Sequence, residues 1–209
     1  MTDLAAVPEF PDVTAFSEVL NRHGVRYVVI GGTAAQFSVP NLITYDVDFT
    51  PATDRGNLDR LSAALAELQV RIRTTAVPEG LPFAHDGASL GRAKMWNLQC
   101  AQGAIDITFE PSGGGYDHLA PRAHVVTLRG VEIPVADLAD IVASKKLANR
   151  PKDTYTYTIV YNLRSSSGPK GAVSGVSGIR CRSPSSEMNM VSQPTWAADS
   201  TPPRRSSVG

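Results

Sequence analysis

The sequence predicts an α/β (α+β) fold in which a mixed β-sheet is flanked by helices. Up to Asp153, short β-branched runs alternate with segments whose apolar residues recur at helical spacing. Hydrophobic residues make up 42% of the 209 residues, which is enough for one ordinary domain with its own core. This alternation of element types is typical of a mixed α/β sheet protein.

The first five expected elements are helices over 11–24, 33–38 and 54–69 and strands over 25–30 and 43–50. Gly24 is placed to end the first helix in a left-handed conformation, and Asp54 is placed to cap the third. Further strands are expected over 70–75, 94–100, 104–110 and 124–135, followed by a last helix over 135–149. A glycine-rich turn is expected at 110–117.

The composition changes at Asp153, which predicts a domain over 1–153 and an atypical tail over 154–209. The first part carries a net charge of −4 and the second a net charge of +4. The tail is rich in Ser, Gly and Pro with few large apolar residues, so we expect it to be largely disordered. A shifted reading frame near codon 153 would explain the abrupt change.

Several protein classes are excluded by the pattern of charges, cysteines and apolar residues. No apolar run approaches the roughly 18 residues needed to span a bilayer, and no export signal is visible at the N-terminus. A cytoplasmic protein without membrane contact is expected. Cys100 and Cys181 are far apart and form no CxxC pair, which argues against a zinc site and a disulfide framework.

Two carboxylates on one expected strand are the first functional signal. Side chains alternate faces along a strand, so Asp46 and Asp48 point the same way while Val47 and Phe49 point into the core. Like charges at this distance are costly unless a cation lies between them. Asp106 repeats the pattern on a later strand. Oxygen-only ligands favour Mg²⁺ or Mn²⁺, so the three acids predict a site for one or two such ions.

The glycine pair before the acids favours a phosphate-binding site. Gly31 and Gly32 follow a buried strand and precede a short helix, where backbone without side chains can approach a triphosphate, and Thr33 would add a hydroxyl donor. Divalent cations beside such a turn suit phosphoryl or nucleotidyl transfer. Arg71 and Arg73 share a strand face and would also reach phosphates, but an exposed sheet edge is the preferred interpretation; Met95 and Trp96 are expected in the core.

The combined pattern "YVVIGGTAAQ", "TYDVDF", "AIDITFE" and "ASKKLANRPKD" resembles the DNA polymerase β-type minimal nucleotidyltransferases, and within them the AbiEii-like toxin group. The resemblance covers roughly residues 12 to 153 and includes Lys145 and Asp153, which match a lysine and an aspartate that recur in that group. It implies a nucleotidyltransferase fold that needs Mg²⁺ or Mn²⁺ and uses an NTP.

The resemblance also implies roles for single residues. Asp46 and Asp48 would bind the metal ions, Asp106 would complete the site, and Lys145 would meet the nucleotide phosphates. The acceptor would be an RNA, such as tRNA, or a protein, and a cognate antitoxin would be a partner. Two alternatives stay open: a non-catalytic or truncated remnant that only binds a nucleotide or a partner, and an antitoxin-type protein adenylyltransferase.

Overall fold

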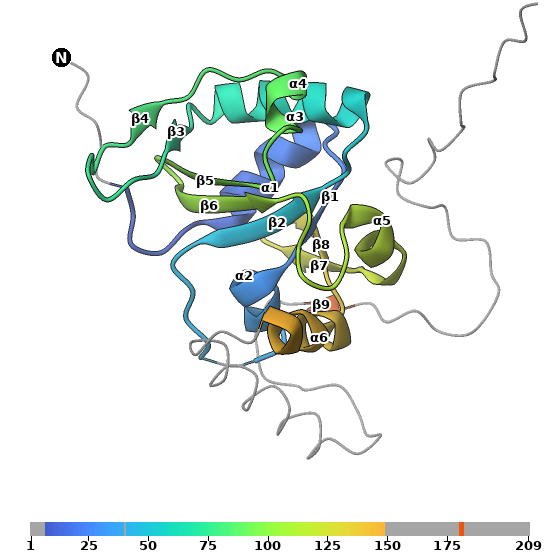
Figure 1. The fold of residues 1–209 in the computed structure, drawn as a ribbon. Helices are drawn as coiled ribbons and strands as arrows, with labels where there is room; N and C mark the ends of the chain where they lie inside the picture. Colours follow the sequence, from blue (N-terminus) through green and yellow to red (C-terminus); the bar gives the residue numbers. More distant parts are fainter. Residues whose placement is uncertain (1–6, 40, 149–179, 182–209) are drawn as a thin grey trace, which may run out of the picture.

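A mixed β-sheet forms the centre of the computed structural model, which describes residues 7–39, 41–148 and 180–181 (Figure 1). In these residues the sheet has nine strands in the order β4-β3-β5-β6-β2-β1-β8-β7-β9. The strands are β1 Tyr27–Val29, β2 Val47–Pro51, β3 Arg71–Ile72, β4 Leu81–Pro82, β5 Met95–Cys100, β6 Gly103–Thr108, β7 His124–Leu128, β8 Val131–Val135 and β9 Arg180–Cys181. Strand β2 pairs antiparallel with β1 and parallel with β6, so the expected mixed α/β fold is confirmed.

The helices cover both faces of this sheet. They are α1 Val13–Arg22, α2 Gly31–Gln36, α3 Arg55–Glu67, α4 Gly87–Leu90, α5 Tyr116–Leu119 and α6 Leu138–Ala148, with a 3₁₀ turn at Ala120–Arg122. Helices α3 and α4 lie on one side of the sheet, whereas α2 and α6 lie next to each other on the other side (Figure 1). The pair α2 and α6 thereby flanks the face on which the candidate site lies.

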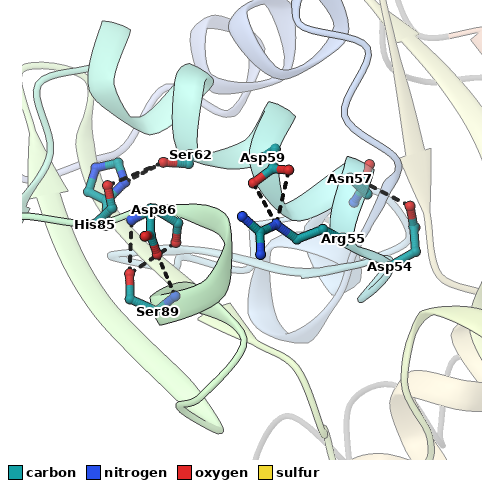
Figure 2. Close-up of polar contacts among 8 residues, drawn as sticks. All are labelled: Asp54, Arg55, Asn57, Asp59, Ser62, His85, Asp86 and Ser89. Atoms are coloured by element: carbon teal, nitrogen blue, oxygen red, sulfur yellow. Dashed lines mark hydrogen bonds and ion pairs between the residues drawn. The ribbon is translucent and has the colours of Figure 1, made fainter.

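Local capping signals explain where several helices begin. The Asp12 side chain caps α1, and the Asp54 side chain accepts a hydrogen bond from the Asn57 N–H at 3.1 Å to cap α3. Figure 2 shows this contact and the reciprocal Asp86–Ser89 pair that caps α4, a short helix not expected from the sequence. Gly24 has φ +65°, which confirms that it ends α1 in the left-handed region.

The core lies between the sheet and the helices α1 and α3. Along β2, Val47 and Phe49 are buried with side chains on the opposite face from Asp48, and Ile105 and Ile107 repeat this on β6. The alternation expected from the sequence is therefore present on both strands, and it fixes the direction in which the acids point.

The expected tail is described at only two residues. Arg180–Cys181 forms β9, which pairs antiparallel with Val126 and Thr127 of β7. These two residues pair with the edge that β7 would otherwise leave open. The expectation that the tail is largely disordered stays a prediction. The rest of 154–209, and the domain boundary expected at Asp153, lie outside the described residues. Within the described ranges, no helix is long and apolar enough to cross a membrane.

Candidate active site

Three carboxylates from two neighbouring strands face one cleft. Asp48 on β2 lies directly opposite Asp106 on β6 in the parallel register, and Asp46 immediately precedes β2. All three line a cleft of about 670 Å³ on the side of the sheet where α2 and α6 lie. The register of the two strands therefore brings together acids that are 58 positions apart in the sequence.

Several segments besides the two acidic strands contribute to the walls of this cleft. They include the start of α2 with Gly31 and Gly32, the loop at 42–44, the turn at 110–114 and the cleft-facing side of α6 with Ser144 and Lys145. The glycine-rich turn predicted at 110–117 thus forms part of the site.

The glycine pair is needed because the backbone approaches the acidic segment closely. Gly31 has φ +62°, and a Cβ at this position would collide with the Asp48 carboxylate. A Cβ on Gly32 would lie 2.8 Å from the Thr44 Oγ1 atom. The Gly32 N–H donates to Asp48 Oδ2 at 3.2 Å. Both glycines belong to the first turn of α2 rather than to a separate turn before it, so the helix begins two residues earlier than expected.

Thr33 supports the acids from behind. Its side chain is buried, its hydroxyl donates to the Asp46 backbone carbonyl at 2.8 Å, and it accepts from the Asp48 N–H at 3.3 Å. The sequence predicts that the Thr33 hydroxyl donates to a phosphate, but Thr33 does not line the cleft. In this conformation it fixes the backbone of both acids, while Thr44 Oγ1 donates to Asp46 Oδ1 at 3.1 Å.

Arg73 is a site residue that the preferred sequence interpretation placed at an exposed edge. Its Nη2 donates to Asp106 Oδ1 at 2.6 Å and lies 3.9 Å from Asp46 Oδ2. Arg71 instead donates to the backbone carbonyls of Glu79 and Gly80. The two arginines therefore have different roles, and only the register of β3 with β5 reveals which one reaches the acids.

Asn97 is a second site residue that the sequence interpretation missed. It lies directly opposite Asp106 in the β5–β6 register and lines the cleft. Met95, two positions before it on the same face, is half exposed and also lines the cleft, so its expected place in the core is wrong. The position of both residues follows from the period of two along β5, a signal already present in "KMWNLQC".

Burial and the neighbouring carboxylates raise the pKa values of Asp48 and Asp106. The pKa of Asp48 is raised to about 7, chiefly by burial and then by the charges of Asp46 and Asp106, against the Gly32 N–H and the Lys145 charge, which lower it. Burial also raises the pKa of Asp106, although its hydrogen bond to Asn97 and its ion pair with Arg73 oppose the shift. A further positive charge in the cleft would therefore be favourable.

The chemistry of the donor set fits Mg²⁺ or Mn²⁺, because it consists of carboxylate oxygens. Across the described residues, however, no three His, Cys, Asp or Glu side chains are arranged so that they could hold a metal ion. Arg73 lies between two of the three candidate ligands, Asp46 and Asp106. Metal binding by the three acids therefore requires a rearrangement of these side chains.

Helix α6 brings Lys145 to the opposite wall of the cleft. Lys145 lines the cleft, whereas the neighbouring Lys146 is exposed and does not. This difference agrees with their separation of about 100° around the helix axis. Asp153, the other residue matched by the family resemblance, lies outside the described residues.

Two known structures are similar to this chain, and one of them reaches a TM-score of 0.50. The crystal structure of the lincosamide antibiotic adenylyltransferase LnuA with lincomycin bound is similar at a TM-score of 0.50 and 13% identity, covering 75% of this chain and 99% of that chain. An antigenic nucleotidyltransferase-like protein from Paracoccidioides brasiliensis is similar at a TM-score of 0.46 and 16% identity, covering 72% and 74%. No family model and no curated protein matches the sequence. The chain therefore has a nucleotidyltransferase fold, as the sequence predicted.

Proposed function

We propose that this protein is a metal-dependent nucleotidyltransferase that moves a nucleoside monophosphate from an NTP to an acceptor hydroxyl. One observation carries the proposal: Asp46, Asp48 and Asp106 share a cleft with the glycine-led start of α2 and with Lys145. The raised pKa values of Asp48 and Asp106 mean that a cation in this cleft is favourable, and a cation in turn favours the triphosphate of a nucleotide.

Each part of the cleft has a proposed role. The triphosphate lies in the cleft against the backbone of Gly31 and Gly32, and the positive charge of Lys145 stabilises the departing pyrophosphate. After the rearrangement described above, the three carboxylates would hold Mg²⁺ or Mn²⁺, and the bound ion would neutralise charge at the α-phosphate. Asp106 accepts the proton of the attacking hydroxyl; the acceptor oxygen bonds to the α-phosphorus as the bond to the β-phosphate oxygen breaks.

The acceptor is proposed from the family resemblance. The AbiEii-like pattern favours an RNA, in particular a tRNA, and a toxin-like role in the cytoplasm beside a cognate antitoxin. An antitoxin-type adenylyltransferase would use the same chemistry on a protein hydroxyl. A small-molecule hydroxyl also has to be tested, because an antibiotic adenylyltransferase has a similar fold.

The test is transfer of label from each of the four α-labelled NTPs to tRNA, to protein or to a small-molecule alcohol, with Mg²⁺ or Mn²⁺. Asp48→Asn and Asp106→Asn should abolish transfer, whereas Asp117→Asn, an exposed acid on α5, should leave it unchanged. Equal activity of all three variants would refute the assignment of the site. Absence of transfer by the wild-type protein with every NTP and acceptor class would refute catalysis.

A nucleotide-binding remnant is the second candidate, and the Arg73 ion pair favours it. The guanidinium already neutralises Asp106, and the described residues contain no ready-made metal site. A remnant would bind an NTP without releasing pyrophosphate. Isothermal titration with a non-hydrolysable NTP analogue, combined with a pyrophosphate-release assay, distinguishes the two candidates: binding without release supports the remnant.

A further inference from the structure

Arg73 occupies the space between two of the proposed metal ligands. Its backbone N–H donates to the Asn97 carbonyl at 2.9 Å, which fixes the start of the side chain at the edge of β5. The side chain then extends across the sheet, and its Nη2 reaches Asp106 Oδ1 at 2.6 Å and Asp46 Oδ2 at 3.9 Å. The Arg73 side chain thus reaches Asp106 on β6 and Asp46, which immediately precedes β2.

A cation shared by Asp46 and Asp106 would need the same space. Mg²⁺ binds carboxylate oxygens at about 2.1 Å and demands near-octahedral geometry, so the ion and its remaining ligands cannot share this volume with a guanidinium nitrogen. The carboxylate of Asp48 is different, because its partner is the Gly32 N–H and it has no ion pair with Arg73. Competition is therefore confined to the part of the site that involves Asp106.

We propose that Arg73 is the counter-ion of Asp106 in the metal-free protein, and that a divalent cation binds between Asp46 and Asp106 only after the guanidinium has moved away. The inference rests on the proposed metal site and goes beyond it by assigning Arg73 a positioning role that competes with the cation. It also accounts for the lack of a ready-made metal site among the described residues, because Arg73 holds the acids around a guanidinium instead.

The exposure of the side chains agrees with this order of events. The Asp106 side chain is 14% exposed, whereas Arg73 and Asp46 are each 31% exposed. Arg73 can therefore turn toward solvent around its side-chain bonds without moving the backbone that the Asn97 carbonyl holds. Asp106 is the more enclosed of the pair, and it would be left in need of a cation once the guanidinium leaves.

The test measures Mg²⁺ and Mn²⁺ affinity of the full chain by isothermal titration, without any nucleotide. Arg73→Gln should bind the cation about five- to tenfold more tightly than the wild type, since a partly exposed ion pair no longer competes. The metal-free variant should also unfold at a lower temperature, because the acids lose their counter-ion. Arg92→Gln, which removes an exposed arginine in the loop before β5, should change neither property.

Two further measurements separate competition from a general change in charge. The affinity gain should persist in high salt, where the Debye length falls to about 3 Å at 1 M and long-range attraction is screened. In a double-mutant cycle, Arg73→Gln should add little in an Asp106→Asn background, because that carboxylate no longer holds the guanidinium. Gains that vanish in salt or stay full in the Asp106→Asn background would overturn the competition.

Other outcomes are equally decisive. Unchanged or weaker cation binding by Arg73→Gln would overturn the proposal, because Arg73 would then have a structural role or would help to bind the cation. If that variant does not fold, Arg73→Met decides, because it removes the competing charge but keeps much of the aliphatic side chain, and it should also bind the cation more tightly. Failure of every variant to bind a cation overturns this inference, whereas cation binding without nucleotidyl transfer refutes only the proposed function.

Discussion

The raised pKa of Asp48 predicts how the metal-free protein responds to pH. Its pKa rises from 3.8 to about 7 on folding. Below pH 3.8 the Asp48 carboxyl is protonated in both the folded and the unfolded protein, so it does not change the free energy of unfolding. As the pH rises further, the unfolded state releases the proton first, so the stability contributed by this group falls until about pH 7 and then stays constant. At about 1.4 kcal/mol for each pH unit, the penalty reaches an upper limit of roughly 4 kcal/mol.

Asp48→Asn removes this ionisation at nearly constant shape. The variant should therefore be more stable than the wild type by about 2 to 4 kcal/mol near pH 8 without metal, and the advantage should shrink toward zero near pH 4. Saturating Mg²⁺ should reduce the advantage, since the cation offsets the repulsion among the carboxylates. The difference between the two proteins is used because it cancels the titration of groups that do not interact with residue 48.

The assay is urea unfolding across this pH range with a chelator or with Mg²⁺, for the wild type, Asp48→Asn and the exposed-site control Asp117→Asn. The control should follow the wild type at every pH. If Asp48→Asn is less stable than the wild type at every pH and Mg²⁺ has no effect, Asp48 is a structural hydrogen-bonding residue and the electrostatic reasoning is refuted.

Three other predictions follow from single contacts. Gly31→Ala should lower the free energy of unfolding in urea by about 2 kcal/mol or more, because the new Cβ collides with Asp48 and strains the backbone. The control is Gly130→Ala, which should show the backbone strain alone, because Gly130 has φ +83° and open space around it. Lys145→Ala should weaken NTP binding in isothermal titration while Lys146→Ala does not; equal effects would remove the lysine from the site. Asn57→Ala should cost about 2 to 4 kcal/mol in urea unfolding, because its fully buried amide bonds three backbone groups; a smaller loss would contradict this account.

Local signals in the sequence were sufficient for most elements and for the acids. The helix expected over 54–69 is α3, and its cap at Asp54 is where the sequence placed it, because a cap depends only on neighbouring residues. The direction of Asp48 and Asp106 also follows from the period of two along a half-buried strand. Such features depend on a few consecutive residues and can be read without knowing the fold.

The missing part of the site depends on which strands are neighbours. Arg73 reaches Asp106 because β3 pairs with β5 and β5 pairs with β6. The order of strands in the sheet differs from their order in the chain, since β5 and β6 lie between β3 and β2. The strand expected over 70–75 is also only two residues long, so Arg73 lies just past its end. Its long side chain reaches the acids from there. No period within "VRIRTT" encodes this pairing, which is a property of the assembled sheet.

Two threonines beside the acids provide the last prediction, because they have the same residue type and burial but opposite hydrogen bonding. Thr33 Oγ1 donates to the Asp46 carbonyl at 2.8 Å and accepts from the Asp48 N–H at 3.3 Å, whereas Thr50 Oγ1 on β2 is buried without a hydrogen-bond partner. Valine has nearly the same shape as threonine, so Thr33→Val should cost about 1 to 3 kcal/mol and Thr50→Val should be neutral or stabilising in urea unfolding. Thr33→Val should also weaken Mg²⁺ binding, since the backbone of both acids loses its support. Equal stability losses with unchanged Mg²⁺ affinity would mean that Thr33 only fills space, and that the acids are positioned by the strand register alone.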